Sequence, residues 1–144
     1  MNTKTSIGRA LLLVAVAMGV AFTGEALAQA AKNRVVIQVS DNDPSKWNLA
    51  LNNAKNLQAD LGAANVEVEI VAYGPGLAML KKGSAVATRV DEAVVSGTKV
   101  LACENTMRNQ KVEKAEMIHD IGYVGAGVVE IMQKQQQGWA YLRP

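Results

Sequence analysis

The sequence predicts an α/β protein, a three-layer sandwich around a mostly parallel sheet of about five strands with flavodoxin-like topology. Two observations lead to this prediction. Short runs rich in β-branched residues alternate with segments whose apolar residues recur at helical spacing. Strands that alternate with helices pair in parallel through right-handed crossovers, which place helices on both faces of the sheet.

The first 28 residues have the pattern of a cleavable secretory signal and are set apart from the fold. A positively charged start precedes an uncharged apolar run over residues 10–22, and an Ala-Leu-Ala sequence ending at Ala28 follows. A membrane-spanning helix needs roughly 20 apolar residues, so this run is too short for an anchor. We expect Sec-type export, cleavage after Ala28 or Ala30, and no membrane contact after cleavage.

The remaining chain, residues 29–144, has roughly 115 residues, which is enough for a single domain with one core. The whole chain has a formal net charge of +2, and aromatic residues make up 4% of it. These values fit neither the basic surface nor the base-stacking platform of a nucleic-acid-binding protein. Cys103 is the only cysteine, so the domain must be stabilised by packing and not by disulfides.

The first half of the domain predicts two strands with a helix between them. Residues 34–39 are rich in β-branched side chains and predict the first strand. Asp43 fits a helix N-cap and Pro44 the first helical position, and Gly62 fits the stop of the amphipathic helix that follows. Residues 66–73 predict the second strand. Its two glutamates alternate with apolar residues, which indicates an edge strand or a strand whose start protrudes.

The second half continues the alternation of strands and helices. Residues 99–103 predict a strand in the middle of the sheet, because the run is short, apolar and bounded by turn residues. The other predicted elements are a Gly-Pro-Gly turn at 74–76, a helical turn at 77–82, an amphipathic helix at 84–95, weak helices at 106–110 and 112–117, a short strand at 121–124, a helix at 126–136 and a terminal strand at 139–142.

The candidate site follows from the strand-end rule, by which ligands bind open parallel sheets beyond the carboxyl ends of the strands. Cys103 ends the expected middle strand, and a helical turn begins shortly after it. Amide dipoles at a helix N-terminus favour the thiolate, which is the reactive form of cysteine. The alternative is that Cys103 is a small apolar residue ending a buried strand. The polar residues that follow it fit the rim of a site better than a core.

Other patterns have weaker functional interpretations. His119, the only histidine, could form a Cys/His couple with Cys103, but a lone histidine in a loop is more often a surface residue. The acidic run at 41–43 resembles the start of a calcium loop, yet Lys46 stands where that loop needs glycine. The cysteine and the methionines could bind Cu(I), but their spacing is more typical of a core. We therefore expect no metal and no cofactor.

A resemblance to a known family rests on three stretches, AYGPG (72–76), ACENTM (102–107) and GAGVVE (125–130). With them, nearly all of residues 34–144 resembles the DsrE/DsrF-like family, which includes sulfur-relay subunits. The resemblance implies an α/β fold and homo-oligomers, namely trimers or hexameric rings of trimers. The relay subunits are cytoplasmic, whereas this chain has an export signal. The signal and the family together indicate the periplasm of a Gram-negative bacterium.

The resemblance also implies an activity, because in the relay members the matching cysteine accepts sulfane sulfur as a persulfide and passes it on. Cys103 would then bear sulfur, and Asn105 and Thr106 would shape its pocket. The strand-end rule adds four pocket residues: Tyr73, Gly74, Gly76 and Ser40. We expect a sulfurtransferase-like carrier with an unknown sulfur donor and an unknown acceptor protein. The alternative is a non-catalytic oligomeric binding or assembly module with a structural cysteine.

Overall fold

The computed structural model describes residues 32–144, so the predicted signal peptide lies outside the described residues. Strands and helices alternate along this part of the chain, as predicted. The elements are β1 (Asn33–Val39), α1 (Pro44–Leu61), β2 (Val66–Ala72), α2 (Ala87–Val95), β3 (Lys99–Cys103), α3 (Glu104–Gln110), β4 (Gly122–Val124), α4 (Gly127–Gln136) and β5 (Ala140–Leu142), with 3₁₀ helices at Ala63–Asn65, Gly74–Leu80 and Lys114–Glu116.

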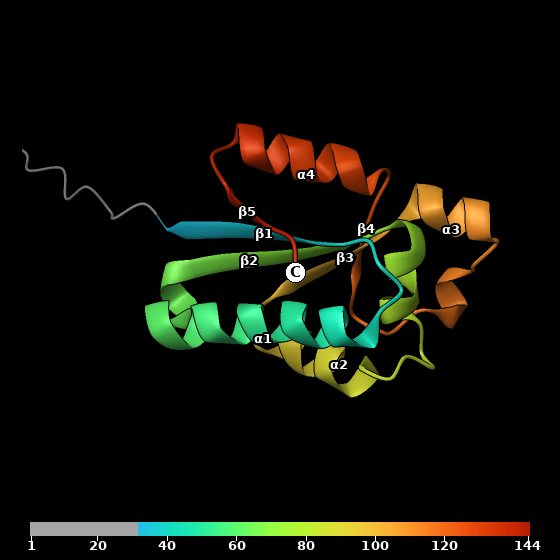
Figure 1. The fold of residues 1–144 in the computed structure, drawn as a ribbon, viewed down its shortest axis with the longest axis horizontal. Coiled ribbons are helices and arrows are strands. Elements are labelled where there is room, and N and C mark those ends of the chain that lie inside the picture. The colour runs from blue at the N-terminus through green and yellow to red at the C-terminus, as the bar shows by residue number, and fades with distance from the viewer. Residues whose placement is uncertain (1–31) are drawn as a thin grey trace, which may run out of the picture.

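The five strands form one parallel sheet in the order β4-β3-β2-β1-β5, which confirms the predicted fold class. Helices α1 and α2 cover one face of the sheet and α4 covers the other, while α3 lies beyond the end of β3 (Figure 1). Each βαβ unit brings the chain back to the same end of the sheet, so the carboxyl ends of all strands meet at one edge.

The hydrophobic core is divided unequally between the two faces of the sheet. The larger cluster lies under α1 and α2 and includes the fully buried Ile37, Ile70 and Leu77. The smaller one lies under α4 and consists of Val36, Val71, Ile131 and Trp139. Consecutive strand residues point to opposite faces, so neighbours such as Ile70 and Val71 belong to different clusters.

Helix α1 has the two ends that the sequence predicts. The Asp43 carboxylate accepts a hydrogen bond from the Ser45 N–H at 2.8 Å, and Pro44 occupies the first turn. The helix ends at Gly62, whose φ of 84° is a conformation that side chains disfavour. The Trp47 indole N–H donates to the Asp41 carbonyl at 2.7 Å, which fixes the loop after β1 against the helix.

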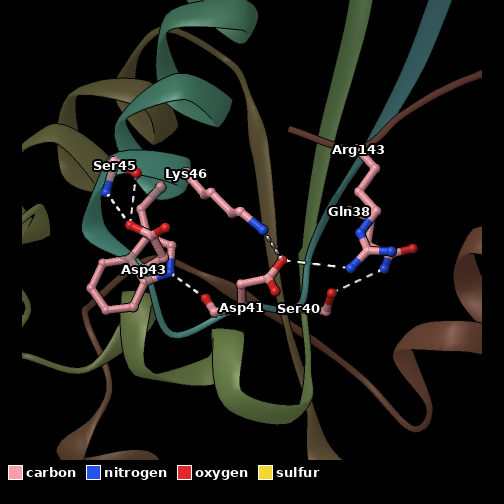
Figure 2. A network of polar contacts seen from close by, with 8 residues as sticks. Gln38, Ser40, Asp41, Asp43, Ser45, Lys46 and Arg143 are labelled. Atoms are coloured by element: carbon pink, nitrogen blue, oxygen red, sulfur yellow. Dashed lines mark hydrogen bonds and ion pairs between the residues drawn. The ribbon is translucent and has the colours of Figure 1, made fainter.

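The end of the chain is tied to this same loop (Figure 2). The Asp41 carboxylate lies 3.1 Å from the Lys46 ammonium and 3.6 Å from the Arg143 guanidinium. The Tyr141 hydroxyl donates to the Gln38 side-chain oxygen at 2.7 Å. These contacts hold β5 and the residues after it along β1, at the edge of the sheet.

The structure corrects the edge position predicted for β2. This strand lies between β1 and β3 at the centre of the sheet, and Glu69 is only 1% exposed. Its carboxylate contacts the Lys134 ammonium at 2.8 Å, so a charge on α4 compensates the one on the strand. Glu67, nearer the start of the strand, stays at the surface with Lys32. β3 is an interior strand, one place from the centre.

The helix predicted at 112–117 is only a 3₁₀ turn, Lys114–Glu116. Lys111 adopts a left-handed conformation with φ of 54° and ends α3, so the chain enters the next segment in a new direction. The Glu116 carboxylate accepts from the Glu113 N–H at 2.8 Å and closes the short turn by capping.

Helix α2 begins at Ala87 and not at residue 84, because the Ser84 hydroxyl binds the N–H of Val86.

Candidate functional site

Cys103 is the last residue of β3 and the N-cap of α3, and its side chain is only 4% exposed. Its Sγ accepts a hydrogen bond from the backbone N–H of Gly127 at 3.2 Å. Gly127 is the first residue of α4, so the sulfur lies between the end of β3 and the first turn of α4. This helix covers the face of the sheet opposite to α1 and α2 (Figure 1). The strand-end position is as predicted, but the thiol is buried and does not sit on an open rim.

The surroundings of the sulfur favour its ionised form. Burial acts to raise the pKa of Cys103, but hydrogen bonds from the Thr106 hydroxyl and from the N–H groups of Gly127, Thr106 and Asn105 outweigh it, so the pKa is lowered. The Gly74 N–H donates to the Thr106 hydroxyl oxygen at 2.9 Å. The Thr106 oxygen therefore acts as the acceptor for Gly74, and the Thr106 O–H acts as a donor to the Cys103 sulfur.

The close approach of α4 to the cysteine depends on Gly127. A Cβ atom on this residue would lie 3.0 Å from Cβ of Tyr73 and 3.2 Å from Val71. The absence of a side chain at Gly127 lets the first turn of α4 come this near to Val71 and Tyr73 without displacing them. Gly127 is therefore a site residue that the analysis by strand ends missed, although a glycine that follows a strand and begins a helix is a signal that could have identified it.

The structure brings some of the predicted pocket residues together around the sulfur and places others elsewhere. Thr106 and Gly74 lie in the hydrogen-bond network just described, and Tyr73 packs against Gly127. Asn105 contributes its backbone, whereas its exposed side chain accepts a hydrogen bond from Arg108. The site is therefore held largely by backbone groups.

Gly76 and Ser40 have other roles. A Cβ on Gly76 would lie 2.3 Å from the carbonyl oxygen of Val39, so this glycine allows close packing of the turn on β1. The Ser40 hydroxyl accepts from Gln38 at 3.1 Å, within the loop network that holds the C-terminal residues. Among residues 32–144, neither residue is hydrogen-bonded to Cys103 or Thr106. His119 is exposed on the segment before β4.

Two surface hollows lie near the buried thiol. One of about 550 Å³ adjoins α3 and includes Glu104, Arg108 and Lys114 in its lining. The other, of about 320 Å³, lies between α4 and β5, and its lining includes Tyr73 and Val128. Tyr73 packs on Gly127, and Val128 follows it in the chain, so this second hollow borders the turn that covers the sulfur.

The described residues offer no arrangement for a metal or a membrane span. Between residues 32 and 144, no three His, Cys, Asp or Glu side chains are grouped so that they could hold a metal ion. In the same range, no helix is long and apolar enough to cross a membrane.

Comparison with known proteins identifies relatives over nearly all of the described chain. The profile of the DsrE/DsrF-like family matches residues 33–144 and supports a sulfur-relay-related role in general. A protein of unknown function from Methanobacterium thermoautotrophicum, MTH1491, has a similar structure with a TM-score of 0.74 and 34% identity. The match covers 78% of this chain and 100% of that one. No curated protein sequence matches.

Two further solved structures share the fold at lower identity. BT1422, a conserved protein of unknown function from Bacteroides thetaiotaomicron, has a TM-score of 0.66 and 17% identity. The match covers 81% of this chain and 99% of that one. The ychN protein from E. coli has a TM-score of 0.60 and 12% identity. The match covers 78% of this chain and 99% of that one.

Proposed function

Since the chain belongs to the DsrE/DsrF-like family, we propose that it is a sulfurtransferase-like carrier that holds sulfur on Cys103 as a persulfide. The observation that carries the proposal is the position of Sγ, which receives the Gly127 N–H at 3.2 Å and lies beside the Thr106 hydroxyl. These donors stabilise negative charge on sulfur. They favour the thiolate that attacks the donor, and they favour the same thiolate again as the leaving group when the acceptor takes the outer sulfur.

The proposed transfer is an exchange between sulfur atoms without net oxidation. The Cys103 thiolate attacks the outer sulfur of a donor persulfide, a bond forms between these two sulfur atoms, and the S–S bond of the donor breaks. The donor leaves as a thiolate, and Cys103 bears the persulfide. An acceptor thiolate then attacks the outer sulfur and regenerates the Cys103 thiolate.

Burial of the thiol restricts access, so the proposal requires local opening. In the single chain, Val128 and Val129, which follow Gly127 in the first turn of α4, are 57% and 42% exposed, and α4 is the outer layer on its face of the sheet (Figure 1). Lifting this turn exposes Sγ while the larger core on the other face stays intact. Helix ends are the usual sites of such local opening.

The test is sulfur loading of the purified mature domain. After incubation with a persulfide donor, intact-protein mass spectrometry should show one added sulfur atom that dithiothreitol removes. Cys103→Ser should remain unloaded. An unloaded wild-type protein whose thiol also fails to react with iodoacetamide would contradict the carrier proposal.

The second candidate is an oligomeric module with a structural cysteine, and the 4% exposure of Cys103 is the observation that favours it. Under this alternative, Cys103→Ser should change stability without any loss of sulfur binding, because the wild type binds none. The mass spectrum of the loaded wild type therefore separates the two candidates.

We also propose that the domain forms homo-oligomers. The supporting observation is a set of exposed apolar side chains on α4 and β5, among them Val128, Met132 and Tyr141, which are 57%, 49% and 40% exposed. Apolar side chains gathered on one face commonly mark a protein interface. Sedimentation at micromolar concentration should show a species larger than the monomer, and a purely monomeric protein would contradict this proposal.

Periplasmic location is proposed from the signal sequence at residues 1–28. When the full chain is expressed in a Gram-negative host, the mature protein should appear in the osmotic-shock fraction. N-terminal sequencing should give a start at Gln29 or Ala31. An unprocessed protein in the cytoplasmic fraction would contradict the proposal.

A further inference from the structure

One face of helix α4 contacts the sheet at three points along its length. Gly127, Ile131 and Lys134 are spaced so that they lie on the same side of the helix. Gly127 meets the end of β2 at Tyr73, Ile131 is buried in the small cluster, and Lys134 reaches Glu69. The helix therefore runs antiparallel to the strands.

The lengths of the two elements agree with this placement. The seven residue steps from Gly127 to Lys134 along the helix rise by about 10 Å. The four residue steps from Tyr73, directly after β2, back to Glu69 cover about 13 Å. The contact at the far end of α4 is thus two helical turns from the amide that binds the Cys103 sulfur.

The far contact is a buried ion pair with additional partners. The Lys134 ammonium lies 2.8 Å from Glu69 and 3.4 Å from Glu130, and 4.3 Å from the centre of the Trp139 ring. Burial raises the pKa of the Glu69 carboxyl, although Lys134 opposes the effect. For Lys134, burial acts to lower the pKa, but the two carboxylates outweigh it and the pKa is raised.

Stability alone is a poor explanation for this ion pair. Removing two charges from water costs free energy that the attraction between them often does not exceed, and well-packed apolar residues are usually as stable. One carboxylate oxygen of Glu69 also has no hydrogen-bond partner among residues 32–144. The best-attested use of a buried ion pair is to specify one register between two elements, here the helix and the sheet.

We infer that the Glu69–Lys134 ion pair positions α4 so that the Gly127 N–H meets the Cys103 sulfur. The two residues touch neither the sulfur nor its hydrogen-bond donors, so they act through the helix as positioning residues. The inference rests on the proposed function for its biological use. The hydrogen bond itself is a property of the thiol and can be measured without any sulfur transfer.

The signs of two substitutions separate positioning from a direct effect of charge. Glu69→Gln removes a negative charge and would by itself lower the thiol pKa, while Lys134→Met removes a positive charge and would raise it. If the pair acts by positioning, both variants weaken the contact of Gly127 with the sulfur. Both should then raise the thiol pKa.

The measurement is a pH titration of the Cys103 thiolate by its ultraviolet absorbance, which does not require a reagent to reach the buried sulfur. We expect each variant to shift the titration midpoint upward by about one pH unit. Lys134→Arg keeps the charge and should stay close to the wild-type profile. Shifts of opposite sign, or no shift in a folded variant, would overturn the inference.

The matched control is Glu67→Gln, which alters the same strand and the same face at a surface ion pair. It should leave the profile unchanged. Should a single variant fail to fold because one charge is left buried, the double variant Glu69→Gln, Lys134→Gln removes both charges and should still raise the thiol pKa. Sulfur loading of the wild type tests the proposed function separately, so failure of one does not imply failure of the other.

Discussion

Replacing Gly127 by alanine perturbs the site at the atom that binds the sulfur. The new Cβ would lie 3.0 Å from Cβ of Tyr73 and 3.2 Å from Cγ1 of Val71. Apolar carbon atoms prefer separations of about 3.5 Å or more, so the first turn of α4 must retreat by about 0.5 Å. The hydrogen bond from the Gly127 N–H to Sγ is 3.2 Å long, and it weakens as the turn retreats.

The retreat has two expected consequences of different size. A hydrogen bond to a charged group contributes about 1.5–3 kcal/mol, and losing roughly half of it raises the thiol pKa by about one unit. Overpacking costs about 1–3 kcal/mol, while the change from glycine to alanine in a helix returns about 0.4–1 kcal/mol. We therefore expect a net loss of about 1 kcal/mol of unfolding free energy.

The assay is a pH titration of the thiolate by its ultraviolet absorbance, together with urea unfolding of the same protein. Gly125→Ala is the matched control, because a Cβ at Gly125 meets nothing within 4 Å. The control should change neither quantity appreciably. If Gly127→Ala and Gly125→Ala have the same thiol pKa, the Gly127 N–H does not set the ionisation of Cys103 and the reasoning is refuted.

Three further predictions concern turns, caps and the thiol itself. Gly76→Ala places Cβ 2.3 Å from the Val39 carbonyl oxygen and should lower the unfolding free energy in urea by about 3 kcal/mol or more, whereas Gly83→Ala, with open space around it, should not. Hydrogen bonds from Ser45 hold the pKa of Asp43 low, so this residue contributes stability above its unfolded pKa that is lost as pH falls through its folded pKa. Asp43→Asn should keep the cap, and the urea midpoint should then depend less on pH in the acidic range. An unchanged pH dependence would contradict the stabilising role of the Asp43 carboxylate. In the wild type, the midpoint of Cys103 alkylation should lie at lower pH than that of the same cysteine in the urea-unfolded protein, and a midpoint at higher pH would contradict the lowered pKa.

Local patterns in the sequence predicted most of the elements because their causes are local. The cap at Asp43 and the stop at Gly62 depend on neighbouring residues only, and the structure has both. The alternation of strands and helices likewise predicted a parallel sheet. Cys103 at a strand end followed from the same reasoning.

The features that the sequence did not predict depend on contacts between distant segments. Glu69 suggested an edge strand, because nothing near it in the chain indicates that Lys134 will neutralise it from the other layer. The Gly127 amide at the sulfur has the same origin. Burial of Cys103 was the less favoured interpretation of the sequence, because it depends on distant contacts: Asn105 is exposed, but Thr106 is buried beside the sulfur and α4 covers the thiol itself.

The pairing of β5 with β1 bears on the order in which the molecule folds. Val35 is opposite Ala140, so the last strand of the chain completes the edge beside the first. During synthesis, or during any passage through a pore, β1 therefore has a free edge until the final residues emerge. Contacts between such distant segments form late, and they make folding slower. An unpaired strand edge also invites association with other chains, so removal of the final strand should increase aggregation during refolding.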